Sequence, residues 1–130
     1  MRILFDQGTP VPLRPFLTSH QVATAFEQGW STLQNGELLA AAERDFDLLI
    51  TTDRNMKYQQ SLAQRRLAIL VLPTTSWPRI ERHAEEIKRE IALIKPGEYR
   101  DCILPLIVVA GFMNLALLRR QRSTALPAPA

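Results

Sequence analysis

Short apolar segments alternate with segments of helical character along most of the chain, and this alternation restricts its fold more than any other feature. The expected strands are residues 2–6, 20–26, 47–52 and 67–73. The last of these reads LAILVLP and is apolar on both faces, which is typical of a strand that helices cover on both sides. Strands alternating with helices in this way predict a three-layer α/β/α fold with a central, mostly parallel sheet.

Helices are expected between the strands. Prolines favour a short helix over residues 11–17, with Thr9 as its N-cap. The segment NGELLAAAERDF is rich in alanine and is expected to form a helix that Asn35 caps. The polar segment RNMKYQQSLAQRR, residues 54–66, is expected to be a further helix.

One long helix is expected to follow Ser76, its proposed cap. Apolar residues recur there at the three- and four-residue spacing of a single buried face; they are Ile80, Ala84, Ile87, Ile91 and Ile94. These elements form one domain over residues 1–101. Residues 102–130 are an apolar extension followed by the tail ALPAPA, which is expected to be disordered.

Composition narrows the class of protein. The chain has 130 residues, 46% of them hydrophobic, which suffices for one domain with a sizeable core. Its single cysteine, Cys102, excludes an internal disulfide framework, and no secretory signal follows Met1, so a cytoplasmic location is expected. The net charge of +3 comes entirely from Arg119, Arg120 and Arg122. The main domain is therefore not a basic nucleic-acid clamp in bulk.

Two of the expected strands end in an acid. The first strand stops at Asp6 in RILFDQGTP, and the third stops at Asp53 in DLLITTDRN, while Glu37 begins the helix before the third strand. Because ligands of parallel sheets bind beyond the carboxyl ends of the strands, these three carboxylates are expected to converge there. A hard divalent cation, Mg²⁺ or Mn²⁺, would relieve their mutual repulsion. Such an ion can activate water for attack on a phosphodiester.

Each acid also has a purely structural alternative. Asp53 could cap the helix that follows it, Glu37 could complement the dipole of its helix, and Asp6 could form an Asx-turn. Asp45 and Asp47 belong to the opposite end of the third strand and are expected to be loop acids. Asp45 would come within reach of the site only if the helix boundary differs.

Other side chains near the acids could contact a substrate. Arg54, Asn55 and Lys57 are candidates for contacts with RNA phosphates, and a solvated helix face is the alternative. Three aromatic residues could stack bases, although packing against the core is the favoured role; they are Trp30, Tyr58 and Trp77. His20 and His83 are expected to be surface histidines or hydrogen-bonded core histidines.

Three segments resemble the small PIN-like domains of bacteria: ILFDQGTP, GWSTLQNGELLAAAERDFDLLITTDRNM and LAILVLP. Those domains have a first strand ending in a DENLP-type sequence, a helix starting with an acid, and a strand ending in T-x-D. The resemblance covers roughly residues 1–95. It implies a PIN-like fold, Mg²⁺- or Mn²⁺-dependent cleavage of RNA, and membership of a toxin–antitoxin pair as the toxin.

The resemblance also assigns roles to individual positions. It implies that Asp6, Glu37 and Asp53 are the metal-binding, catalytic acids and that Thr51 or Thr52 adds a hydroxyl to water or metal. The chain departs from the pattern because the second acid of the DEN motif is Gln7 and its asparagine is replaced by glycine. The fourth carboxylate of many PIN nucleases has no clear counterpart.

These departures keep other functions open. One alternative is a catalytically weak PIN-like module that binds a partner, either a cognate antitoxin or a second copy, through an edge strand or the tail. Another is a phospho-receiver-like signalling domain, with Asp6 and Asp53 at strand ends and Lys95 as the receiver's lysine. Against it, Lys95 follows a helix and the first strand ends in one acid only.

The apolar run of residues 103–118 is interpreted separately because it lies outside the resemblance. A spanning helix needs about 20 apolar residues, and Pro105, Gly111 and Asn114 interrupt this shorter run, so membrane attachment is not the favoured interpretation. One alternative is a final strand near residues 99–109 that joins the sheet and is followed by a helix. Another is an apolar surface that a partner covers.

Overall fold

The structure, a computed structural model, describes residues 1–56 and 65–104. Its strands are β1 (Arg2–Phe5), β2 (Gln21–Thr24), β3 (Leu48–Thr51), β4 (Ala68–Val71) and β5 (Tyr99–Asp101). Its helices are the 3-10 helix η1 (Val11–Leu17) and the α-helices α1 (Asn35–Asp45), α3 (Trp77–Arg82) and α4 (Ala84–Leu93). All four expected strands are present, in slightly shorter form, and β5 adds a fifth.

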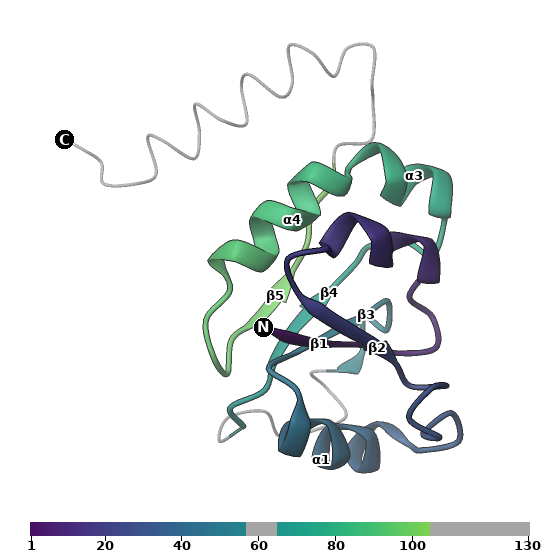
Figure 1. The fold of residues 1–130 in the computed structure, drawn as a ribbon, viewed down its shortest axis with the longest axis vertical. Coiled ribbons are helices and arrows are strands. Elements are labelled where there is room, and N and C mark those ends of the chain that lie inside the picture. The colour runs from purple at the N-terminus through teal and green to yellow at the C-terminus, as the bar shows by residue number, and fades with distance from the viewer. Residues whose placement is uncertain (57–64, 105–130) are drawn as a thin grey trace, which may run out of the picture.

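The strands form one sheet in the order β2-β1-β3-β4-β5, and every pairing is parallel. Helix α1 covers one face of this sheet, while η1, α3 and α4 cover the other (Figure 1). The three-layer α/β/α fold expected from the alternation of strands and helices is therefore confirmed. Over the described residues the sheet is entirely parallel, whereas a mostly parallel sheet was expected.

Side chains along each strand alternate between the two hydrophobic layers. On β1, Ile3 and Phe5 pack toward η1 and α4, whereas Leu4 packs toward α1. Strand β4 behaves in the same way, with Leu70 in the first layer and Ile69 in the second. Every residue of β3 and β4 is buried, which is the pattern of strands covered on both faces.

The helix expected after Ser76 is divided in two. The backbone of His83 has φ and ψ of −115° and 22°, outside the helical region, so α3 ends and α4 begins at this residue. The carbonyl of His83 accepts hydrogen bonds from the N–H groups of Glu86 and Ile87 at 3.0 and 3.1 Å, which starts α4. The expected buried face is confirmed, because Ile80, Ala84, Ile87, Ile91 and Ile94 are all buried.

Two expected helix caps are wrong. Pro10 occupies the N-cap of η1, and the hydroxyl of Thr9 instead lies against Asp6 and the carbonyl of Ile50. Gln34 occupies the N-cap of α1, so Asn35 is the first residue inside that helix. Both displaced side chains are directed toward the acids of the sheet edge.

Part of the C-terminal interpretation is confirmed. Strand β5 joins β4 through Asp101, as the final-strand alternative expected, and Cys102 is buried beside it. Residues 105–130, which include the rest of the apolar run and the tail, lie outside the described residues. So do residues 57–64, which make up most of the helix expected over residues 54–66 and include Lys57 and Tyr58. Among the helices of the described ranges, none is both long enough and apolar enough to cross a membrane.

Candidate metal centre at the carboxyl edge of the sheet

Asp6 lies directly after β1 and is held by the loop that follows. Its Oδ1 accepts hydrogen bonds from the Gly8 N–H at 3.2 Å and from the Thr9 hydroxyl at 2.9 Å. The bond to Gly8 is the Asx-turn that the sequence allowed as an alternative. Burial raises the pKa of Asp6 above its ordinary value, while the hydrogen bonds from Thr51, Thr9 and Gly8 oppose this shift. The carboxyl group is thus desolvated and supplied with several donors.

Thr51 connects Asp6 to the end of the neighbouring strand. It is the last residue of β3 and is fully buried. Its hydroxyl donates to Asp6 Oδ2 and accepts a hydrogen bond of 3.0 Å from the backbone N–H of Asp53. A single side chain therefore fixes the two acidic strand ends relative to each other.

Asp53 is held at both carboxylate oxygens. Oδ1 accepts a hydrogen bond of 2.9 Å from the Asn55 N–H, and Oδ2 accepts one of 3.0 Å from Asn35 Nδ2. The first bond has the form of the local cap that the sequence allowed for this residue. The second bond comes from Asn35 at the start of α1. It was not expected, because the sequence suggested that the Asn35 side chain caps the helix.

Glu37 does not join the other two acids. Its side chain is exposed, and Oε1 accepts a hydrogen bond of 3.1 Å from the backbone N–H of Gln34, the N-cap of α1. Within residues 1–56 and 65–104 there is no group of three acidic, histidine or cysteine side chains close enough to hold one metal ion. The expected convergence of three carboxylates is thus not found, and the side chain from the start of α1 that contacts Asp53 is Asn35.

The order of the strands explains why Asp6 and Asp53 lie at the ends of adjacent strands. In the order β2-β1-β3-β4-β5, the chain first moves to one side of β1 and then to the other, so the switch point lies between β1 and β3. Open parallel sheets bind ligands in the crevice beyond the carboxyl ends of the strands at such a point. Asp6 and Asp53 follow the two strands that flank it.

Gly8 and Thr52 pack closely beside the acids. A Cβ atom added to Gly8 would overlap Thr52 Oγ1 and would lie 3.8 Å from Asp6 Oδ1. The absence of a side chain at Gly8 therefore permits this close approach of two loops. Of the two threonines expected to assist, Thr51 contacts Asp6 directly and Thr52 contacts the turn that holds it.

A cavity of about 470 Å³ adjoins the site over β4 and β5. Arg54 and Asn55, both expected to contact substrate, line it together with Asp101 at the end of β5. The guanidinium of Arg54 donates to the carbonyl of Pro73, which orients it at this edge. Asp101 was not singled out from the sequence, because no apolar run precedes it. It is separated from β3 by β4, so it lies two strand spacings, roughly 10 Å, from β3.

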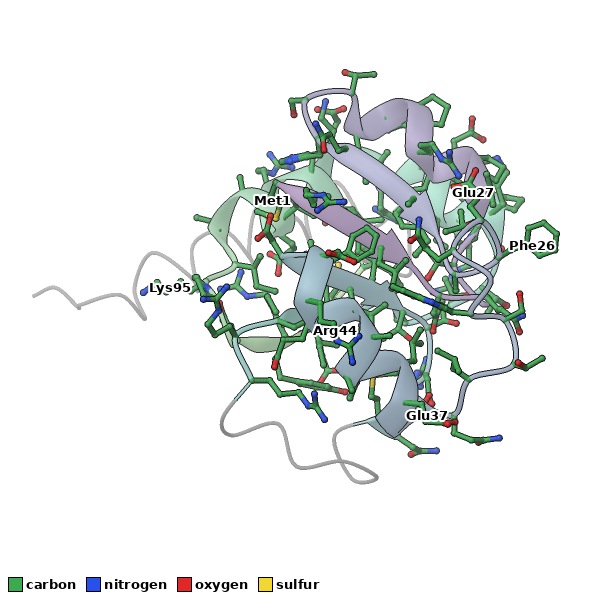
Figure 2. The ribbon with its side chains drawn as sticks, turned by 60° about the horizontal axis from the view of Figure 1, so that its bottom comes forward. Met1, Phe26, Glu27, Glu37, Arg44 and Lys95 are labelled. Carbon is green, nitrogen blue, oxygen red and sulfur yellow. The ribbon has the colours of Figure 1, made fainter. Side chains whose placement is uncertain are left out.

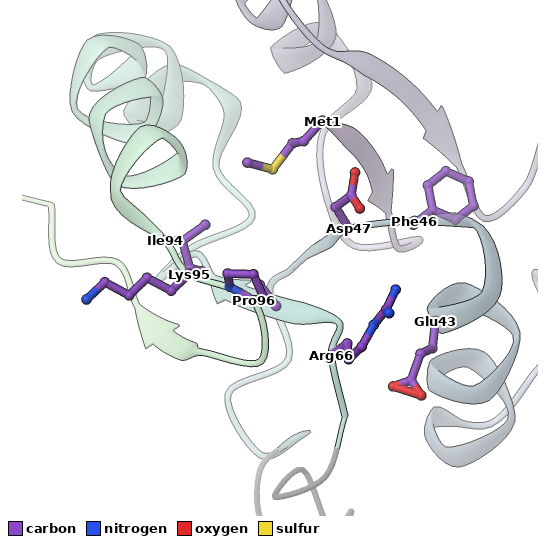
Figure 3. A pocket seen from close by; sticks show the side chains of 9 residues that line it. Met1, Glu43, Phe46, Asp47, Arg66, Ile94, Lys95 and Pro96 are labelled. Carbon is purple, nitrogen blue, oxygen red and sulfur yellow. The ribbon is translucent and has the colours of Figure 1, made fainter.

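Lys95 lies at the opposite edge of the sheet. It lines a second cavity, of about 370 Å³, whose other walls include Met1, Asp47 and Arg66 from the segments that precede strands (Figure 3). Figure 2 likewise shows Lys95 on the other side of the molecule from Glu37. Lys95 therefore cannot reach Asp53, which argues against the phospho-receiver alternative.

The tryptophan and histidine side chains of the described ranges have structural partners. Trp30 packs edge-on against Phe46 with ring centroids 6.1 Å apart, and Trp77 packs against Phe16 at 5.9 Å. His83 Nδ1 lies 3.5 Å from Glu86 Oε1, and His20 Nδ1 lies 3.2 Å from the N-terminal amine. Packing, the favoured role for the two tryptophans, is confirmed.

Comparisons of the chain with protein-family models, with curated proteins and with solved structures found no match. The likeness to PIN-like domains stays a prediction that rests on the short motifs of the sequence.

Proposed function

We propose that the chain is an endoribonuclease in which Asp6 and Asp53 hold one Mg²⁺ or Mn²⁺ ion. The observation that carries the proposal is the link that Thr51 makes, at the switch point of the sheet, between the carboxylate of Asp6 and the backbone N–H of Asp53. The choice of RNA rests on the resemblance to PIN-like domains, as does a role as the toxin of a toxin–antitoxin pair.

The donor atoms suit a hard cation. Asp6, Asp53 and Thr51 offer only oxygen atoms, and Mg²⁺ is usually bound by one or two carboxylates together with water and substrate phosphate. Each carboxylate has about four acceptor positions, and Asp6 uses three of them while Asp53 uses two. Both acids therefore keep capacity for a further partner.

Burial of Asp6 gives a second reason for a cation. Its pKa is raised because the ionised form loses solvation, and a nearby positive charge would stabilise that form. When bound, the ion would supply electrostatic stabilisation of the charge that develops on a phosphodiester and a nucleophile from water. The protein would hold Asp6 and Asp53 in place through Thr51, Thr9 and Asn35.

Substrate contacts would come from the side of β4. Arg54 is exposed and anchored by Pro73, and Asn55 is exposed next to it. Both line the cavity beside Asp53, where a phosphate next to the cleaved bond would lie. Their role is to position the backbone of the substrate rather than to read its sequence.

Cleavage of a mixed RNA pool in Mn²⁺ tests the proposal. Asp6→Asn and Asp53→Asn are each expected to lower the cleavage rate by more than about 100-fold, since even partners of metal ligands typically matter by 10–100-fold. Asp45→Asn is the matched control, because Asp45 is an exposed acid at the other end of α1. Cleavage that survives in either site variant, or that chelation does not abolish, would overturn the proposal.

One observation favours a non-catalytic binding module as the second candidate. Glu37 is engaged at the start of α1, which leaves two acids where PIN-like nucleases have more. Binding of Mn²⁺ at Asp6 and Asp53 without any cleavage of RNA would select this candidate.

A further inference from the structure

Phe26 is an exposed aromatic residue at the same edge of the sheet as the two acids. The residue exposes 77% of its surface to solvent. It is the only aromatic residue among the large exposed hydrophobic residues of the described ranges. Figure 2 shows its ring standing away from the ribbon at the margin of the molecule. Trp30, four residues later, packs inward against Phe46 instead.

The register of β1 and β2 places Phe26 close to Asp6. Phe5 pairs with Thr24, and the N–H of Ala25 donates to the carbonyl of Phe5 at 2.8 Å. Asp6 and Phe26 then follow within one or two residues of these partners. With strands about 4.8 Å apart and 3.8 Å between consecutive Cα atoms, their backbones lie within about 10 Å of each other.

The turn that carries Phe26 is held by hydrogen bonds on both sides. The carbonyl of Phe26 accepts from the Gly29 N–H at 3.0 Å, and Gly29 has a φ of 77°, which favours glycine. Thr24 and Glu27 bond each other twice, from each backbone N–H to the other side chain, at 3.0 and 3.1 Å. Glu27 also pairs with Arg14 at 3.1 Å. An aromatic ring on such a turn is presented with little further loss of conformational freedom.

The proposed site lies between this ring and the basic side chain of the substrate cavity. Phe26 follows β2 on one side of the switch point, and Arg54 follows β3 on the other side. A nucleic-acid strand that crosses the carboxyl edge would meet a phosphate contact at Arg54, the two acids, and then an aromatic face.

We infer that Phe26 stacks an unpaired base of a single-stranded substrate whose backbone lies at the Asp6–Asp53 site. The inference rests on the proposed function and assigns to Phe26 one contact with its substrate. Bases within a duplex already stack on one another and cannot offer a face to an aromatic ring at the protein surface, whereas unpaired bases can. Stacking of one base on an aromatic side chain typically changes affinity by about 5- to 150-fold.

The test measures binding without cleavage. A fluorescently labelled single-stranded RNA and the duplex of the same sequence are titrated by anisotropy with proteins that carry Asp53→Asn and are kept in chelator. In this background Phe26→Ala is expected to weaken binding of the single strand at least about fivefold, whereas Phe26→Trp is expected to preserve it. Neither substitution is expected to change binding of the duplex. Leu93→Ala, at an exposed apolar residue of α4, is the control and is expected to have no effect.

Salt dependence separates stacking from phosphate contact. Phe26→Ala should shift the dissociation constant by the same factor at every salt concentration, whereas Arg54→Ala should lower the slope of log affinity against log salt by about one. Three results would overturn the inference. Phe26→Ala could bind single strands as tightly as the Asp53→Asn protein, Phe26→Leu could retain full affinity, or single strands could fail to bind at all. Full affinity in Phe26→Leu would indicate a simple apolar contact, as a protein partner would make.

The two proposals can fail separately. If RNA binding depends on Phe26 but the wild-type protein never cleaves RNA, the proposed catalysis is overturned and base stacking is supported. Metal-dependent cleavage that is indifferent to Phe26 in both binding and rate would support the catalysis and overturn base stacking.

Discussion

The hydroxyl of Thr51 donates a hydrogen bond to Asp6 and thereby joins the carboxyl ends of β3 and β1. The same oxygen accepts from the backbone of Asp53, so the geometry of both acids depends on one buried side chain. Removal of this hydroxyl would leave Asp6 Oδ2 and the Asp53 N–H without this partner.

Thr51→Val keeps the shape of the side chain and deletes its hydroxyl. It is expected to lower the free energy of unfolding by about 1–3 kcal/mol, because polar groups at a desolvated site lose a hydrogen-bond partner. Urea unfolding measures this change. Thr51→Ser retains the hydroxyl and should recover most of the loss, and Thr75→Val at an exposed position should be near neutral. A loss as large in Thr51→Ser would show that packing of the methyl group, not the hydrogen bond, is responsible.

Asp6→Asn is expected to stabilise the metal-free protein at neutral pH. Burial raises the pKa of Asp6 above 3.8, so the folded protein binds its proton more tightly than the unfolded chain does. Ionised Asp6 therefore opposes folding above its folded-state pKa, and this cost disappears as the pH falls below 3.8. We expect a gain of about 0.5–2 kcal/mol at neutral pH, typical of single stabilising substitutions.

Urea unfolding of wild type and Asp6→Asn across the acid range, in chelator, checks the sign of this effect. The difference in unfolding free energy should shrink as the pH is lowered. A difference that grows on acidification would mean that the ionised carboxylate stabilises the fold, contrary to the burial argument.

Gly8→Ala tests the contact between the two loops that carry the acids. The added Cβ overlaps Thr52 Oγ1, so the substitution is expected to cost about 1–3 kcal/mol. In a Thr52→Ala background the overlapping atom is gone, and the same substitution should cost much less. A double-mutant cycle from urea unfolding measures this coupling. Strictly additive effects would place the cost of Gly8→Ala in the local backbone instead.

Glu37→Gln distinguishes a helix-capping role from metal binding. A glutamine oxygen can still accept from the Gln34 N–H, so stability and Mn²⁺ affinity should stay close to those of wild type. Glu37→Ala removes the acceptor and should cost about 0.3–1.5 kcal/mol of stability without affecting metal affinity. Thermal unfolding and Mn²⁺ titration give the two readouts. A tenfold loss of Mn²⁺ affinity in Glu37→Gln would instead establish Glu37 as a ligand, as the sequence suggested.

The layers and the acidic sheet edge could be predicted because they depend on simple repeating patterns. The apolar runs that end at Asp6 and Asp53 identify the strands and their carboxyl ends, and parallel strands necessarily place those ends at one edge. The buried face from Ile80 to Ile94 also follows from spacing alone, although the break at His83 does not, because no proline or glycine marks it.

The details of the site depended on contacts between distant segments. Asn35 and Glu37 lie two residues apart in the first turn of α1, and only the structure shows that Asn35 contacts Asp53 while Glu37 bonds the start of the helix. Asp101 is the last residue of a three-residue strand that carries no apolar run, so no signal in the sequence marks it. Phe26 was overlooked because an exposed phenylalanine and a buried one are identical in sequence.

Calorimetric titration of Mn²⁺ into wild type, Asp6→Asn, Asp53→Asn and the control Asp45→Asn tests the shared site most directly. We predict that wild type and the control bind one ion per chain, and that each site variant loses at least about tenfold in affinity. Absence of binding by wild type, or undiminished binding by both Asp6→Asn and Asp53→Asn, would contradict a metal centre at these two strand ends.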